Sequence, residues 1–236
     1  MTETVVFLPD QMCDARLFGP QIADLSRDQA VMTAPITLGD RIEEIASSLL
    51  DLAPTRFALV GHGMGGIVAM EVYRRAPERV TRLALVGTTP LAETPQVAAL
   101  RDPQMIRARA GRFEEVLAET FAQGDLAPGP HRREVLALVL DMARGLGTEV
   151  FVRQSRALQR RRDQQGTLRR INVPTLILCG AVDTLYPVKR HSFMAEMIPK
   201  ADLRVIDDAG RMPTLEQPEA VTLALRDWLA QPLLLR

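Results

Sequence analysis

The sequence is poor in several residue types whose abundance would indicate particular kinds of protein. Its 236 residues include two cysteines, Cys13 and Cys179, which lie far apart without a Cys-x-x-Cys spacing. This argues against a disulfide framework and a zinc site. No stretch approaches the roughly 18 consecutive apolar residues of a membrane span, and the start, Met-Thr-Glu-Thr, lacks the features of a signal peptide. We therefore expect a cytoplasmic protein with no membrane partner.

Aromatic residues and lysine are also scarce. Aromatics make up 4% of the chain, and all basic residues except Lys189 and Lys200 are arginines. The arginines are scattered, and the 29 basic residues are matched by 29 acidic ones, so the sequence offers neither a basic patch nor the stacking platforms of a nucleic-acid-binding protein. A hydrophobic fraction of 47% is typical of a globular protein, and the length fits one domain carrying an insertion.

Short apolar runs alternate with segments of helical period. The runs, which predict strands, are Thr4–Leu8, Gln29–Thr33, Phe57–Val60, Leu83–Val86, Thr175–Cys179 and Leu203–Ile206. The segments with apolar residues three or four apart, which predict helices, are Asp14–Leu25, Asp40–Leu52, Gly65–Arg75, Val188–Ile198 and Glu216–Leu229. The alternation predicts an α/β fold with a mostly parallel, doubly wound sheet of about six strands.

Residues 91–170 interrupt this alternation, since they contain helical stretches such as Arg112–Ala122 and Arg133–Leu146 but no convincing strand. We predict that they form a helical cap inserted into a core made of residues 1–90 and 171–236. Between cap and core we expect an apolar chamber for a small, largely apolar ligand. The side chains expected to line the chamber are Met12, Met64, Met105, Phe113, Phe121, Met142 and Met212.

The most informative motif is residues 57–70, FALVGHGMGGIVAM, a predicted strand that passes through a glycine-rich turn into a helix. This context resembles a nucleophile elbow, G-x-S-x-G, with Gly63 at the position of the nucleophile. The segment lacks the G-K-[ST] of a P-loop, and its last glycine spacing departs from the dinucleotide fingerprint. Nucleotide binding is therefore a weak interpretation.

With three further segments, this motif resembles the α/β-hydrolase family, in particular its short bacterial members of esterase or lactonase type. Residues 7–18, FLPDQMCDARLF, are similar to the loop that supplies part of the oxyanion hole. Residues 179–187, CGAVDTLYP, resemble the turn that presents the triad acid, and residues 207–219, DDAGRMPTLEQPE, the segment that presents the triad histidine. The resemblance implies an α/β-hydrolase fold and a carboxylic-ester or C–C bond hydrolase, with no metal and no cofactor.

Three of these landmarks carry residues unsuited to that chemistry. Gly63 stands at the serine position, Arg211 at the histidine position, and Asp10 where the oxyanion loop should have a glycine; Asp183 retains the triad acid. Glycine is no nucleophile, arginine cannot act as a base, and losing either residue costs on the order of 10⁶ in turnover. The sequence therefore predicts a pseudoenzyme with a degenerate catalytic triad that binds a small molecule or a partner.

Two alternatives stay open. One is an enzyme of altered mechanism, acting on a small ester, lactone or diketone with Asp10 as base and Arg211 as electrostatic stabiliser; the other is an inactivated esterase. In each case we expect Asp10, Gln11 and Met64 to contact the ligand, and Arg211 to lie between Asp10 and Asp183. The oligomeric state is left open.

We expect none of the remaining candidate bases and nucleophiles to be catalytic. We expect His62 to be packed and hydrogen-bonded, and His131 and His191 to lie at the surface. Cys13 is expected to be a buried, inert thiol.

Overall fold

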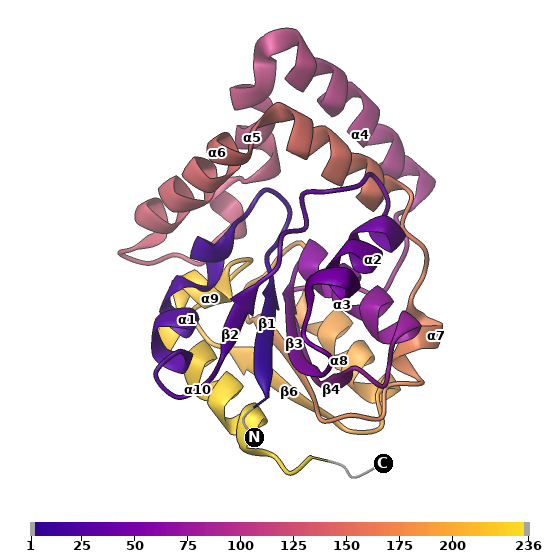
Figure 1. Ribbon diagram of the computed structural model, residues 1–236. Coiled ribbons are helices and arrows are strands. Elements are labelled where there is room, and N and C mark those ends of the chain that lie inside the picture. Colours follow the sequence, from indigo (N-terminus) through magenta and orange to yellow (C-terminus); the bar gives the residue numbers. More distant parts are fainter. Residues whose placement is uncertain (1–2, 234–236) are drawn as a thin grey trace.

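The computed structural model describes residues 3–233, in which one sheet of six strands runs in the order β2-β1-β3-β4-β5-β6 (Figure 1). The strands are β1 (Thr4–Leu8), β2 (Val31–Thr33), β3 (Phe57–His62), β4 (Val80–Val86), β5 (Thr175–Gly180) and β6 (Ala201–Ile206). Every neighbouring pair is parallel. The predicted doubly wound α/β fold is therefore confirmed.

Helices cover both faces of the sheet, because successive strand residues point to opposite faces and both sets are apolar. Val5 and Phe7 belong to one hydrophobic cluster, whereas Val6 and Leu8 belong to the other. The helices on the first face are α1 (Gly19–Leu25) and α10 (Pro218–Ala230), and those on the second are α2 (Ile42–Leu52), α3 (Met64–Arg75) and α8 (Val188–Met197). The short helices α7 (Gln165–Leu168) and α9 (Pro213–Glu216) lead into β5 and α10.

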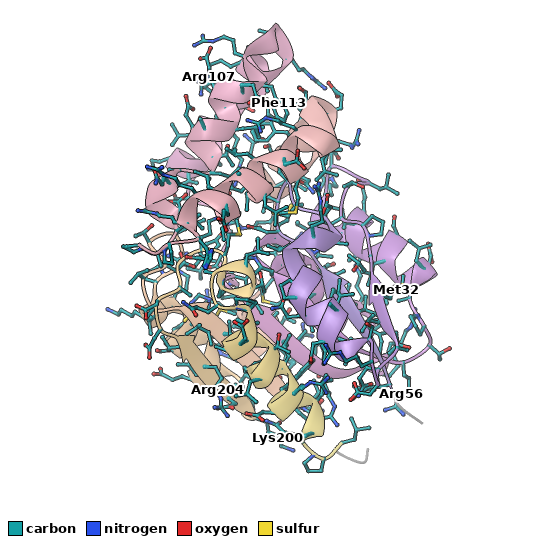
Figure 2. All side chains as sticks on the ribbon, turned by 90° about the vertical axis from the view of Figure 1, so that its left-hand side faces the viewer. Met32, Arg56, Arg107, Phe113, Lys200 and Arg204 are labelled. Atoms are coloured by element: carbon teal, nitrogen blue, oxygen red, sulfur yellow. The ribbon has the colours of Figure 1, made fainter. Side chains whose placement is uncertain are left out.

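Between β4 and β5 the chain forms three longer helices and no strand: α4 (Pro95–Arg107), α5 (Phe113–Thr120) and α6 (Arg132–Gln159). They lie across one end of the sheet, and Figure 2 shows Arg107 and Phe113 at the end of this layer farthest from Lys200 and Arg204. None of the helices in residues 3–233 combines the length and apolar character needed to cross a membrane. The division into a core and a cap with boundaries at 90 and 170 stays a prediction.

The strand order brings two loops together at one place. From β1 the chain moves to β2 on one side, and β3 then returns to the other side of β1. The carboxyl ends of β1 and β3 are therefore adjacent, with Leu8 opposite Gly61. Such a reversal is where parallel sheets build ligand sites, and here it joins the loop after β1 to the turn after β3.

Candidate functional site

The turn between β3 and α3 leaves no room for a side chain at its tip. Gly63 has φ 53° and ψ −116°, which places it on the left-handed side of backbone space that favours glycine. A Cβ atom at this position would lie 1.9 Å from Oδ1 and 2.1 Å from Cγ of Asp10. Glycine at 63 and the present position of the Asp10 carboxylate are thus mutually dependent.

The carboxylate of Asp10 binds two backbone N–H groups that converge on one of its oxygens. Oδ1 accepts hydrogen bonds from the backbone nitrogens of Gln11 and Met64, both at 2.7 Å. Met64 is the first residue of α3, so its N–H is one of those that a helix leaves unpaired at its start. Two N–H groups aimed at one anionic oxygen form the geometry of an oxyanion hole. In this chain its own carboxylate occupies that position.

The loop that carries Asp10 is tied to α6. The backbone nitrogen of Met12 donates to the Gln154 side chain at 2.8 Å, and the Gln11 side chain donates to the Ser155 hydroxyl at 3.3 Å. All four of these residues are buried. The position of Asp10 is thus fixed from both sides, by the α3 terminus and by α6.

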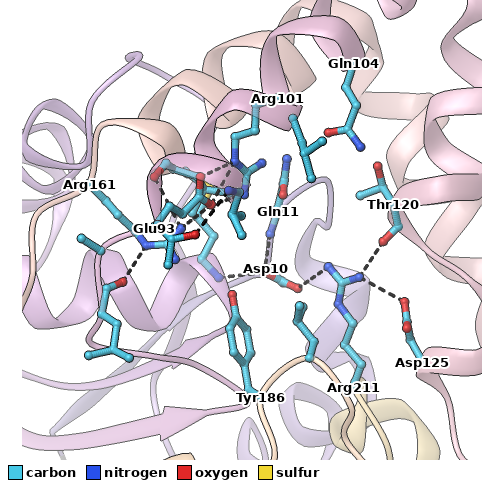
Figure 3. Close-up of a pocket in the computed structure, with 18 of the residues that line it drawn as sticks. Asp10, Gln11, Glu93, Arg101, Gln104, Thr120, Asp125, Arg161, Tyr186 and Arg211 are labelled. Carbon is cyan, nitrogen blue, oxygen red and sulfur yellow. Dashed lines mark hydrogen bonds and ion pairs between the residues drawn. The ribbon is translucent and has the colours of Figure 1, made fainter.

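Arg211 lies beside Asp10, in the loop after β6 (Figure 3). Its Nη2 is 3.5 Å from Asp10 Oδ2, and its Nη1 is 3.6 Å from Asp125 Oδ2 and donates to the Thr120 carbonyl at 2.6 Å. The guanidinium carbon lies 4.8 Å from the centre of the Phe121 ring. Burial acts to lower the pKa of Arg211, but the neighbouring carboxylates hold it above its ordinary value. Arg211 is therefore a buried, permanently charged group.

A glutamate holds the turn from which Arg211 projects. Glu216 accepts hydrogen bonds from the backbone nitrogens of Met212 at 2.7 Å, Gly210 at 3.0 Å and Ala127 at 2.7 Å. The carboxylate thereby joins the loop after β6 to the segment that follows Asp125. This glutamate belongs to the sequence segment 207–219, but its role in positioning Arg211 becomes visible only in three dimensions.

Of the two carboxylates expected around Arg211, Asp10 forms an ion pair with it and Asp183 does not. The structure places Arg211 between Asp10 and Asp125, and no ion pair joins it to Asp183 within residues 3–233. The reason is reach, because the arginine side chain extends to the α5 end, where Thr120 and Phe121 hold it. A shorter side chain at 211 would end nearer its own loop.

Asp183 is left with one free oxygen. Its Oδ1 accepts the backbone N–H groups of Leu185 and Tyr186, each at 2.9 Å. Its Oδ2 is buried and has no hydrogen-bond partner in the part of the chain that the structure describes. Burial raises the pKa of Asp183 to about 6, although the two N–H groups act to lower it.

This pKa predicts a pH-dependent effect of the substitution Asp183→Asn. The pKa of Asp183 is near 4 in the unfolded chain and about 6 in the folded protein, so between pH 4 and pH 6 the folded state binds more protons than the unfolded one. The contribution of Asp183 to the free energy of unfolding therefore falls as the pH rises. Asparagine does not titrate. We expect the free energy of unfolding of Asp183→Asn, relative to the original chain, to rise by about 2 kcal/mol between pH 4 and pH 7.5, measured by urea unfolding.

Comparing Asp183→Asn with the original chain removes the contributions of the other buried groups that titrate in this pH range. Burial lowers the pKa of His62 and of His191 to about 4, so their contributions have the opposite sign, but both histidines are present in both proteins. A difference between the two proteins that stays constant from pH 4 to pH 7.5 would contradict the raised pKa.

The structure corrects two of the expectations for the histidines and Cys13. His62 is fully buried as expected, but neither ring nitrogen has a hydrogen-bond partner among the described residues. His191, expected at the surface, is buried, and its Nε2 accepts from the Thr88 backbone at 3.2 Å because α8 packs against β5 and β6. His131 is exposed. Burial raises the pKa of the Cys13 thiol well above its usual value, which makes it an inert thiol.

A cavity of about 560 Å³ lies over Asp10, lined by residues of the loops after β1, β4 and β5 and of α4 and α6 (Figure 3). Asp10, Gln11 and Met64 line it together with Tyr186. Its lining contains eight side chains with charged groups, namely Asp10, Glu93, Arg101, Glu119, Asp125, Arg161, Arg190 and Arg211. Among the described residues no group of three or more His, Cys, Asp or Glu side chains could hold a metal ion.

Most of the side chains predicted to line this cavity are wrong. Of the seven side chains predicted to face it, Met64 alone does so. The other six, Met12, Met105, Phe113, Phe121, Met142 and Met212, pack in or against the hydrophobic core. Other apolar side chains of α4 and α6 line the cavity, namely Val97, Leu100, Phe151 and Leu158, together with charged residues and the loops after β4 and β5.

Comparison with known proteins agrees with this fold. Residues 12–224 match the sequence profile of the alpha/beta hydrolase family. The pimeloyl-[acyl-carrier protein] methyl ester esterase of Aromatoleum aromaticum is 27% identical over 208 residues, which cover 80% of this chain and 80% of that protein. The putative carbamate hydrolase RutD of Yersinia enterocolitica is 26% identical, covering 86% of this chain and 73% of that protein.

Solved structures give the same result. A thermophilic esterase from Thermogutta terrifontis, solved with malate bound, superposes with a TM-score of 0.86 at 25% identity, over 97% of this chain and 90% of that one. The enol-lactonase of Burkholderia xenovorans LB400 superposes with a TM-score of 0.85 at 23% identity, over 98% of this chain and 92% of that one. The latter likeness concerns the fold alone.

Proposed function

Since the chain belongs to the alpha/beta hydrolase family, we propose that it is a member without Ser-triad hydrolysis, whose cavity binds a small molecule. Several relatives are named as esterases or hydrolases, and their chemistry needs a nucleophile, a base and an oxyanion hole. At the corresponding places this chain has Gly63, Arg211 and a carboxylate. We therefore propose that the site lost these three catalytic groups and retains the binding cavity.

The position of the Asp10 carboxylate is the observation that carries the proposal. In this family the backbone N–H after the nucleophile and an N–H of a neighbouring loop stabilise the oxyanion of the intermediate. Here the N–H groups of Met64 and Gln11 both bind Asp10 Oδ1. These two donors are therefore unavailable to a substrate carbonyl oxygen, and negative charge developing there would be repelled by the carboxylate.

The same carboxylate occupies the space of the missing serine side chain. A Cβ at 63 would lie only 1.9 Å from Asp10 Oδ1, so nucleophile and carboxylate exclude each other. One residue thus blocks two of the three requirements of hydrolysis, and Arg211 removes the third because it is no base.

The alternative in which Asp10 acts as a base has less support. A base needs a free oxygen within about 3 Å of the proton that it takes. Oδ1 already accepts two hydrogen bonds, and Oδ2 faces the Arg211 guanidinium at 3.5 Å. Both oxygens are engaged, which is the arrangement of a structural carboxylate.

The charged cavity changes the expected ligand. A largely apolar molecule would leave the arginines and carboxylates of the lining without partners other than one another. We therefore propose a ligand that carries a polar or charged group as well as an apolar part, since Met64, Leu91 and Phe151 also line the cavity.

The test is an assay panel of esters, lactones and 1,3-diketones across pH, on the original chain and on Asp10→Asn. We expect both proteins to match the buffer rate on every substrate. Turnover that Asp10→Asn abolishes would favour Asp10 as a base and overturn the proposal. Turnover that survives Asp10→Asn would also overturn it, by indicating a nucleophile elsewhere.

A further inference from the structure

Two arginines on one side of the cavity share a single carboxylate. Arg101 donates through Nε to both oxygens of Glu93, at 3.0 and 2.9 Å, and Arg161 donates through Nη1 to Glu93 at 2.6 Å (Figure 3). The side chain of Glu93 is 3% exposed and that of Arg161 is 7% exposed. Burial acts to raise the pKa of Glu93, but the two guanidinium groups lower it below its usual value. One negative charge therefore faces two positive ones.

Both guanidinium groups retain unused donors. Nη1 of Arg101 and Nη2 of Arg161 make no hydrogen bond within residues 3–233, and neither is among the buried unpartnered atoms. Both arginines line the cavity. Because an arginine has five N–H donors and no acceptor, these groups can be satisfied only by water or by an acceptor on a ligand.

Arg190 is a third arginine in the lining of this cavity. Its Nη1 lies 3.3 Å from the Thr89 hydroxyl, and its guanidinium carbon lies 5.8 Å from the centre of the Tyr186 ring. No carboxylate of the described residues forms an ion pair with it, whereas the other cavity charges are paired: Arg211 with Asp10 and Asp125, and Glu119 with Arg107. The guanidinium wall, defined as Arg101, Arg161 and Arg190, thus carries three positive charges against one.

The whole cavity lining carries four arginines and four carboxylates, but the guanidinium wall itself has a net positive charge, which attracts anions. Planar guanidinium groups also match carboxylates in shape. Apolar side chains stand next to the wall, because Val97, Leu100 and Leu185 line the same cavity and are 46%, 66% and 45% exposed. We propose that the cavity binds an organic monocarboxylate, with its carboxylate on the guanidinium wall and its hydrocarbon part against these side chains. The inference rests on the proposed function insofar as the cavity is a binding site.

The test uses straight-chain carboxylates of four to ten carbons and their neutral amides, titrated calorimetrically into the full chain at constant ionic strength. We expect at least one carboxylate to bind tenfold or more tightly than its amide, since hydrogen bonds between charged groups are about twice as strong as neutral ones. Arg190→Gln should weaken carboxylate binding at least tenfold and leave amide binding unchanged. This arginine is chosen because loss of Arg101 or Arg161 would disturb the buried Glu93 pair.

The matched control is Arg144→Gln, which removes an exposed arginine of α6 paired with exposed Glu114 and outside the cavity lining. It should bind carboxylates as the original chain does. Equal binding of acid and amide, no binding of any acid at 10 mM, or equal effects of the two substitutions would overturn the proposal. Hydrolysis of the corresponding methyl esters would overturn the proposed function instead, and the titrations would still decide on the carboxylate.

Discussion

Restoring a serine and a histidine by Gly63→Ser and Arg211→His is expected to give no measurable esterase activity until Asp10→Gly is added. In the double variant the serine Cβ would collide with Asp10 Oδ1, and the displaced carboxylate would stay beside the oxyanion donors and repel the negative charge that develops on the substrate. The third substitution frees the N–H groups of Gln11 and Met64 and opens the space at 63. The free Oδ2 of Asp183 is then available to orient the new imidazole.

The expected difference is large. Removing the catalytic serine or histidine from a triad enzyme costs about 10⁶ in turnover, so we expect the triple variant to exceed the double variant by about 10³ on p-nitrophenyl acetate. Adding Asp183→Asn to the triple variant should remove about 10² or more of this gain, which distinguishes triad chemistry from nonspecific hydrolysis. Equal rates for the double and triple variants would show that Asp10 is no obstacle.

Gly63→Ala is expected to destabilise the protein by about 4 kcal/mol, and by only about 1 to 3 kcal/mol when Asp10→Gly is also present. In the original chain the new methyl group has to displace the Asp10 carboxylate from two hydrogen bonds, each worth about 1.5 to 3 kcal/mol for a charged group. In the Asp10→Gly background the cost is backbone strain at φ 53° alone. Urea unfolding of the four proteins gives the coupling free energy.

Asp10→Gly by itself provides the reference for this cycle, because it removes the carboxylate without adding an atom at 63. A destabilisation by Gly63→Ala that is the same in both backgrounds would mean that strain alone requires glycine there. In that case the mutual dependence of positions 10 and 63 would be wrong.

The sequence predicts the sheet well, because its four central strands, β1, β3, β4 and β5, are mostly buried apolar runs. The helices that cover the sheet have an apolar period. The main differences are in the inserted region. The sequence does not predict α4, because Pro103 lies inside it and Val97, Leu100 and Ile106 form no buried apolar face. The sequence predicts a helix over 133–146, but α6 continues to Gln159 because Gly147 kinks the helix at φ 80° without ending it.

The sequence predicts which residues meet at the site, but it does not predict the contacts that they make there. Segment order alone brings Asp10, Gly63, Asp183 and Arg211 to the same sheet edge, because parallel strands end together. That Asp10 turns inward onto two N–H groups depends on loop geometry, and that Arg211 pairs with Asp125 depends on a residue 86 positions earlier in the chain. The guanidinium wall likewise joins three segments that the sequence separates, and no local pattern marks them.

The most direct test of the account is the intact mass of the original chain after incubation with a fluorophosphonate, which phosphonylates activated serines. A serine esterase of the family serves as positive control, and the triple variant as the matched one. We predict that the original chain keeps its mass, because its oxyanion donors are occupied and position 63 has no hydroxyl. One phosphonyl group per chain on the original protein would contradict the account.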